Sequence, residues 1–158
     1  IFAGTILAFY TDNLLLIPGM LIILPGFLEM RGNISGTFAS RLSSGLFLKV
    51  INPNKIDKKI IKGNLISSFI LAAIVSLLLG LIAFAFNYLI LGITAAKIIF
   101  IPFLAGLISN TVEITLTLFM TIYLFKKGHD PNNIMGPFIT TTGDITSIIS
   151  LLIVIAVI

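Results

Sequence analysis

The 158-residue sequence contains no cysteine and few charged residues. The absence of cysteine excludes disulfides, iron–sulfur clusters and thiolate metal sites. Charged residues make up only 10% of the chain, against about 25% in a typical soluble domain. Hydrophobic residues make up 58%, so there is too little polar surface to cover a soluble globule. The composition predicts an all-α membrane protein.

Sequence patterns that mark enzymes are also missing. The chain has no Gly-rich phosphate loop, no nucleophile–histidine–acid set and no redox motif. Its single histidine, His129, has no second histidine or cysteine to complete a metal site, so we assign it to the surface. The net charge is +4, but aromatic residues do not alternate with the basic ones, which argues against nucleic-acid binding. We expect neither an enzyme nor a nucleic-acid partner.

Five apolar segments predict about five transmembrane helices in a single cation-transport domain covering residues 1–158, without a soluble domain. Residues 1–9 are too few to cross a ~30 Å hydrocarbon core and resemble the end of a helix that begins upstream. Residues 14–48 would form a straight helix ~50 Å long, and the prolines and glycines within them predict a broken or strongly tilted helix. The remaining segments are residues 64–91, 97–125 and 130–158.

The distribution of lysines predicts the orientation of these helices. Residues 49–63 contain Lys49, Lys55, Lys58, Lys59 and Lys62, and Lys126 and Lys127 precede the last segment. Both loops fall on the same side of a serial threading, and the other side has only Lys97. The positive-inside rule places loops 49–63 and 126–130 in the cytoplasm and the C-terminus outside the cell. We read residues 49–63 as a solvated loop that sets this topology, with a partner-docking or lipid-binding patch as the alternative.

Asp144 is the only charged residue after Asp130. A helix that starts at Asp130-Pro131, with Asp as the N-cap, would place Asp144 roughly 20 Å along its axis, near the bilayer midplane. A carboxylate at the centre of a membrane helix costs about 2.5–3.5 kcal/mol. Such a residue is therefore expected to face water, a partner charge or an ion.

Hydroxyl groups accompany this carboxylate. Thr140, Thr141 and Ser147 are predicted to share the helical face of Asp144, and together they offer only oxygen ligands. Hard cations such as Mg²⁺, Mn²⁺ and Ca²⁺ suit that environment. A buried aspartate bonded to neighbouring helices is the alternative interpretation.

Two further segments carry polar residues at membrane depth. In the second segment Asn33 is predicted to line a pore, and Glu29 either does so or neutralises Arg31. A stripe of small residues for close helix packing follows it: Gly32, Gly36, Ser40 and Ser44. In the fourth segment Glu113 could be a second ion site, a proton carrier or the ion-pair partner of Arg31 or Arg41.

Two blocks of sequence resemble the membrane domain of the MgtE and eukaryotic solute-carrier magnesium transporters. The first is Pro25-Gly-Phe-Leu-Glu-Met-Arg-Gly-Asn33 followed by Thr37-Phe-Ala-Ser-Arg-Leu-Ser43. The second is Asp130-Pro-Asn-Asn-Ile-Met-Gly-Pro-Phe-Ile-Thr-Thr-Thr-Gly-Asp144. The first block is closer to the solute-carrier branch, and the second fits both. The correct order and spacing of both blocks extend the resemblance over nearly the whole chain.

The resemblance implies a homodimer, or a fused tandem repeat, with a pore lined by the second and fifth helices. It places Asp144 at the metal site, Gly32 and Asn33 on the pore-lining second helix, and the Thr140 carbonyl where it could face the ion. The transported ion would be Mg²⁺, with Mn²⁺ or another divalent cation also compatible. Phe38 stands where bacterial members often have glutamine, and the cytosolic sensor domains of many bacterial members are not in this chain.

The sequence therefore predicts a divalent cation channel or transporter in the plasma membrane, embedded in lipid as a homodimer. Two alternatives stay open. Asp144 and Glu113 could titrate in a proton- or Na⁺-coupled exchanger. The polar residues could instead hold helices together in a membrane assembly subunit that transports nothing.

Overall fold

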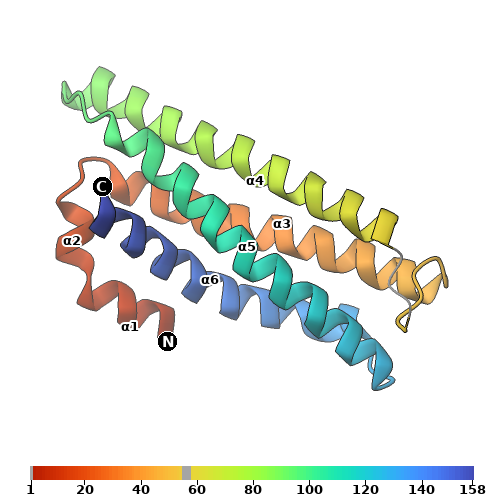
Figure 1. Ribbon diagram of the computed structural model, residues 1–158. Coiled ribbons are helices and arrows are strands. Elements are labelled where there is room, and N and C mark those ends of the chain that lie inside the picture. Colours follow the sequence, from red (N-terminus) through yellow and green to blue (C-terminus); the bar gives the residue numbers. More distant parts are fainter. Residues whose placement is uncertain (1, 55–57) are drawn as a thin grey trace.

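The computed structural model describes residues 2–54 and 58–158, and every regular element in that part of the chain is a helix (Figure 1). The predicted all-α fold is confirmed. Two short N-terminal helices are followed by four long ones, of which the second ends in a π-helical turn. In chain order they are α1 (Phe2–Phe9), α2 (Thr11–Leu15), α3 (Met20–Phe47), α4 (Lys58–Phe86), η1 (Asn87–Leu91), α5 (Lys97–Lys126) and α6 (Pro131–Val157).

The four long helices run side by side along one axis (Figure 1). Helices α3 and α5 contact each other, and each also contacts both α4 and α6. Helices α4 and α6 are not in contact, so they lie on opposite sides of the central pair. Helix α1 packs on α6. This arrangement leaves two lateral grooves beside α3, one facing α6 and one facing α4.

Among the described residues, three helices are long and apolar enough to span a membrane, namely Lys59–Leu91, Lys97–Lys126 and Pro131–Val157. The prediction of about five spans is therefore not confirmed. Helix α3 has 28 residues, which is long enough, but Glu29, Arg31 and Arg41 lower its hydropathy. Helix α1 has only 8 residues.

The second segment is interrupted at Pro18 and Gly19, and not at Pro25, Gly26 or Gly32. The chain turns at residues 16–19, where Gly19 adopts a left-handed conformation with φ 81°. The buried amide of Asn87 fixes this turn by donating a 2.7 Å hydrogen bond to the Pro18 carbonyl. Helix α3 then continues unbroken through Pro25 and Gly32. Pro25 is only five residues from the start of α3, so it removes one hydrogen bond without ending the helix.

Close approach of α4 and α5 depends on two glycines. A Cβ at Gly80 would lie 2.6 Å from the Ile99 carbonyl oxygen, and a Cβ at Gly106 would lie 2.8 Å from the Ser76 Cβ. Atoms do not approach so closely without displacement, so the absence of side chains at these positions sets the separation of the two helices. The width of the bundle is thereby fixed on this side.

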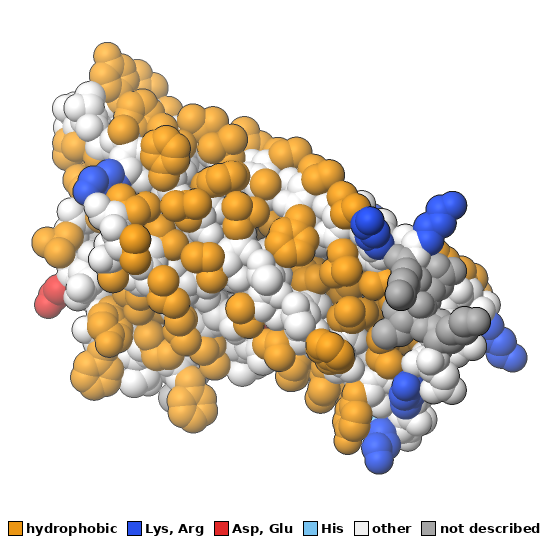
Figure 2. All heavy atoms as spheres, viewed as in Figure 1, with side chains coloured by type: hydrophobic (Ala, Val, Ile, Leu, Met, Phe, Trp, Pro, Cys, Tyr) orange, Lys and Arg blue, Asp and Glu red, His pale blue; other side chains and the backbone are white. Residues whose placement is uncertain are grey.

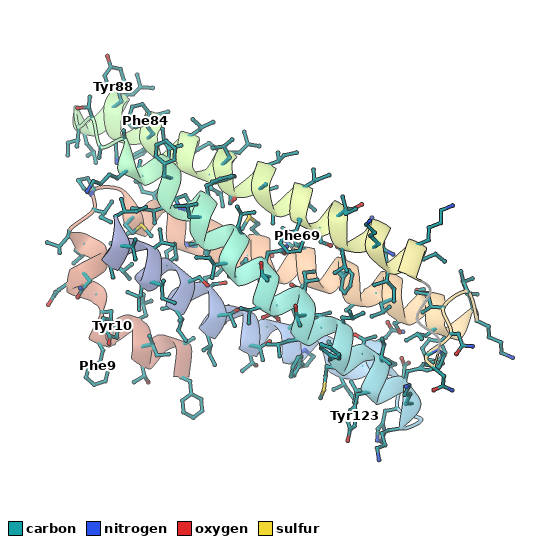
Figure 3. The ribbon with its side chains drawn as sticks, viewed as in Figure 1. Phe9, Tyr10, Phe69, Phe84, Tyr88 and Tyr123 are labelled. Carbon is teal, nitrogen blue, oxygen red and sulfur yellow. The ribbon has the colours of Figure 1, made fainter. Side chains whose placement is uncertain are left out.

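The surface has the distribution expected for a protein embedded in lipid. Hydrophobic side chains cover the length of the bundle, and lysines and arginines gather at one end of it (Figure 2). Tyr88 and Tyr123 lie at opposite ends of the molecule (Figure 3), where aromatic rings commonly sit at the membrane–water interface. Lys55 lies outside the described residues. We call the end that holds Lys49, Lys59, Lys62, Lys126 and Lys127 the basic end.

A candidate cation site between α3 and α6

Helices α3 and α6 border a cavity of about 430 Å³. Five of the seven residues predicted for the metal site line it. They are Glu29, Gly32, Asn33, Thr140 and Asp144. Asn33 and Asp144 are 111 positions apart in the sequence (144 − 33), and the fold brings them to the same cavity.

The α6 wall of the cavity is built around Asp144. The helix begins as predicted, because the Asp130 side chain accepts a 2.9 Å hydrogen bond from the Asn132 backbone N–H and Pro131 follows as the first residue. Asp144 is half-buried and lies thirteen residues after Pro131 in a helix of 27 residues, which is its middle. One turn before it, the Thr140 hydroxyl donates to the Gly136 carbonyl at 3.0 Å. The carboxylate and the threonine oxygen are available to a ligand from the same side.

The α3 wall supplies a second carboxylate and an amide. Glu29 and Asn33 are one helical turn apart, and the Asn33 Nδ2 donates a 3.2 Å hydrogen bond to the Glu29 Oε1. The Asn33 Oδ1 and the Glu29 Oε2 take no part in this hydrogen bond, and both residues line the cavity. Both side chains are exposed.

The front of the cavity is open. A Cβ added at Gly32, Gly36 or Gly136 would meet nothing within 4 Å. The small-residue stripe on α3 therefore does not pack against another helix of the same chain at Gly32 and Gly36. A second cavity of about 250 Å³ shares Gly36 and Gly136 and extends past Ser40 and Asn132. The two cavities form one track from Asp144 toward the basic end.

Three polar residues of the same segments lie outside this cavity. Thr141 is exposed beside it and donates a 2.9 Å hydrogen bond to the Pro137 carbonyl. Ser147 is fully buried and does not line the cavity, so its hydroxyl does not face the same space as Asp144. Three residues correspond to about 300° of helix rotation, so Ser147 is offset from Asp144 by about 60° around the axis and lies at the interior edge of that face. Glu113, the third of these residues, belongs to α5 and does not line the cavity.

Glu113 lies between α5 and α6, with an exposed fraction of 0%. Its Oε1 accepts a 2.9 Å hydrogen bond from the Thr142 hydroxyl, and its Oε2 accepts a 3.2 Å hydrogen bond from Thr146. A Cβ at Gly143 would lie 3.8 Å from the Glu113 carboxylate. Since Gly143 also lines the cavity, Glu113 sits directly behind the cavity wall.

Arg31 occupies the same interior and also has an exposed fraction of 0%. Its guanidinium donates to the Asn110 Oδ1 at 3.2 Å and to the Ser109 carbonyl at 2.8 Å. No nitrogen of Arg31 lies within 4.0 Å of a Glu113 oxygen, although the two charges interact electrostatically. The two charges are linked through α5, which contains Glu113 and accepts the hydrogen bonds of Arg31, and they form no direct salt bridge.

The interior around these charges retains unpaired polar atoms. Among the described residues, the hydroxyls of Ser35, Thr117 and Ser147 and the Nδ2 of Asn110 have no hydrogen-bond partner. Sequence reasoning found the polar face of α5 but missed the partners that α6 gives it. The spacing of Thr142 and Thr146 by four residues, on the opposite side of α6 from Thr140 and Asp144, is the signal that could have revealed them.

The described residues contain no group of three or more histidine, cysteine, aspartate or glutamate side chains that could hold a metal ion. A cation in the cavity would therefore meet one aspartate, one glutamate, an amide oxygen and a hydroxyl from this chain. Such a sparse set of oxygens suits an ion that keeps much of its water.

A helical bundle with membrane-spanning segments and a polar cavity at mid-depth has the architecture of a membrane transport protein. The family model for MgtE, described as a divalent cation transporter, matches residues 24–154. The chain therefore belongs to the MgtE family of divalent cation transporters, which is a transporter family and not an enzyme family, as predicted.

A curated relative agrees with this family. The chain is 26% identical over 148 residues to the magnesium transporter MgtE of Bacillus subtilis (strain 168). The match covers 93% of this chain and 31% of the relative, so the chain spans about a third of that protein's length. No solved structure gives a significant match.

Proposed function

We propose that this protein forms a pore for Mg²⁺ or a similar divalent cation at a homodimer interface, where α3 and α6 of two copies face each other. The observation that carries the proposal is the single cavity that gathers Glu29, Asn33, Thr140 and Asp144 halfway along α6. The chain acts as one transmembrane cation-transport domain in this proposal.

The size of the cavity fits a hydrated ion. Six water molecules at about 30 Å³ each occupy roughly 180 Å³, and the cavity measures about 430 Å³. Mg²⁺ releases its water reluctantly and usually keeps several of its inner-shell molecules. Carboxylate, amide and hydroxyl oxygens can hold such an ion through its waters without replacing them.

The open side of the cavity supports a second copy. Glu29, Asn33 and Thr140 are exposed, and polar groups at membrane depth are unstable against hydrocarbon. The open space in front of Gly32 and Gly36 lets another helix approach closely. A twofold partner would enclose the cavity and bring a second Asp144 to it. Two carboxylates that face each other repel when the site is empty, which favours a divalent ion over a monovalent one.

We place the basic end on the cytoplasmic side of the plasma membrane, because the lysines are concentrated there. The track that leads from Asp144 past Ser40 and Asn132 would then open toward the cytoplasm.

The test is Mg²⁺ entry into liposomes that contain a Mg²⁺-sensitive dye, driven by a membrane potential without a proton or sodium gradient. Asp144→Asn should lower the flux about tenfold or more, since hydrogen bonds to a charged group contribute about 1.5–3 kcal/mol. Asp12→Asn, the same substitution at an exposed residue of α2, should leave the flux unchanged. Equal flux in wild type and Asp144→Asn would remove Asp144 from the ion path. Flux that requires a proton or sodium gradient would favour the exchanger.

A further inference from the structure

The groove between α3 and α4, on the side of α3 away from the main cation cavity, contains two adjoining cavities of about 320 and 460 Å³. They share Arg41 and Asn64, and neither has a lining residue in common with the cavity at Asp144. The groove meets the second cavity of the track at Ser40, but it includes none of the residues around Asp144, so an inference about it does not depend on the proposed pore.

The lining of the groove combines one polar cluster with apolar side chains on both sides of it. Ile34, Phe38, Leu71 and Ile74 line the part nearer the middle of the bundle. Arg41, Asn64 and Ser67 follow, and toward the basic end the lining also includes Leu48, Val50, Ile51 and Ile60. From Asn64 to Ile74 the groove follows ten residues of α4, or roughly 15 Å. An amphipathic ligand with one charged end matches a lining in which a single charge adjoins an apolar stretch.

Arg41 is the only formal charge that lines the groove in the described part of the chain. Its side chain is exposed and makes no hydrogen bond or ion pair there, whereas Arg31 on the same helix is buried and bonded. Arg41 lies six residues before the end of α3 at Phe47, roughly 9 Å inside the helix end. A guanidinium at that depth, with five free N–H donors, favours an anionic partner. The planar arrangement of these donors matches the oxygens of a phosphate.

The surroundings favour an anion that arrives from the membrane. Lysines and arginines gather at the same end of the bundle in Figure 2, and a basic surface of this kind attracts anionic lipids. At the other end Lys97 donates to the Ile158 carbonyl at 2.7 Å. The charge gradient along the bundle thus complements the anionic headgroups of one leaflet.

We propose that the groove between α3 and α4 is a binding site for an anionic phospholipid. Arg41 holds the headgroup phosphate, the polar residues around Asn64 and Ser67 contact the glycerol region, and one acyl chain lies along Phe38, Leu71 and Ile74. The proposal concerns a specifically retained lipid, in addition to the lipid that covers any membrane protein.

Native mass spectrometry of the purified protein, with phosphatidylglycerol and phosphatidylcholine added in equal amounts, tests this site. The wild-type protein should retain phosphatidylglycerol in preference. Arg41→Gln should bind it about tenfold more weakly, since loss of hydrogen bonds to a charged group costs at least about 1.4 kcal/mol. Lys127→Gln removes the same charge at the same end but outside the groove, and it should retain the lipid within about twofold of the wild type.

Further variants distinguish a bound lipid from a second copy of the chain in the groove. Leu71→Trp fills the apolar part of the groove without changing charge and should also reduce lipid retention. Size-exclusion profiles of the variants should match that of the wild type. Equal retention in Arg41→Gln and wild type, or equal loss in Arg41→Gln and Lys127→Gln, would overturn the proposal. Since the chain has no cysteine, Ser67→Cys adds a single thiol, and disulfide-linked dimers through it would show that a second copy occupies the groove instead.

Discussion

The two buried charges behind the cavity allow a quantitative test of what holds the bundle together. Arg31 and Glu113 are both fully buried and lie within one network, without a direct contact between them. Arg31→Met keeps the length and apolar stem of the side chain but removes the charge and the two hydrogen bonds to α5. It also leaves Glu113 in the interior without a compensating positive charge.

The expected loss from Arg31→Met is about 3–5 kcal/mol, the usual effect of removing one partner from a buried charge network. At roughly 2–4 °C per kcal/mol for a chain of this size, the unfolding midpoint should fall by roughly 6–20 °C. Glu113→Gln retains an acceptor for Thr142 or Thr146, so its loss should be smaller, about 1–3 kcal/mol. The double variant should lose less than the sum of the two, because it leaves no unpaired charge.

The wild type, the two single variants and the double variant together form a double-mutant cycle. Their unfolding midpoints are measured by heating in detergent and following the folded fraction by size-exclusion chromatography. A coupling of about 0.5–3 kcal/mol is expected for residues within one network. Arg41→Met makes the same substitution at an exposed position of the same helix, and it should change the midpoint little. If the losses of Arg31→Met and Glu113→Gln add without coupling, the two charges do not stabilise each other and the proposed network is refuted.

Two further predictions concern helix packing. Gly80→Ala places a methyl group 2.6 Å from the Ile99 carbonyl oxygen and should destabilise the protein by about 1–3 kcal/mol. The control Gly63→Ala meets open space and should stabilise α4 by up to about 1 kcal/mol. Equal thermal unfolding midpoints for the two variants would contradict the close approach of α4 and α5. Gly36→Cys should form disulfide-linked dimers on mild oxidation if α3 helices of two copies meet, while Ile82→Cys, on the exposed face of α4, should remain monomeric. Crosslinking of both to the same extent would indicate random collision in the membrane.

Local sequence signals predicted the helices better than they predicted the turns between them. Asp130-Pro131 marked the start of α6 correctly, because capping is decided by adjacent residues. Of the prolines and glycines that predicted an interruption of the second segment, those at Pro18 and Gly19 mark it, and the turn is held by Asn87, which is 69 residues away from Pro18. No local pattern contains that contact. Pro25, Gly26 and Gly32 were signals of the same local kind, yet α3 is continuous through them.

The candidate site was predictable to the extent that helical periodicity decides it. Asn33 and Thr140 were placed near Asp144 from polar character and depth, and they line one cavity with it. Glu113 shared those properties but faces the interior of the bundle. Polarity and depth do not reveal which neighbour a helix face meets, and only the packing of α5 against α6 separates the two carboxylates.

The position of Gly143 limits how this protein can change. One side of this residue borders the cavity and the other side lies against the Glu113 carboxylate, so an added methyl group would just reach contact at 3.8 Å. Any larger side chain would have to enter the cavity or displace the buried Glu113 carboxylate. The shape of the cavity and the burial of Glu113 therefore cannot vary independently at this position. Glu29 and Asn33 carry no such constraint, because their side chains are exposed and bonded only to each other. In the proposed pore, ion preference can therefore vary through substitutions in α3, whereas substitutions in α6 are restrained by the stability of the bundle behind it.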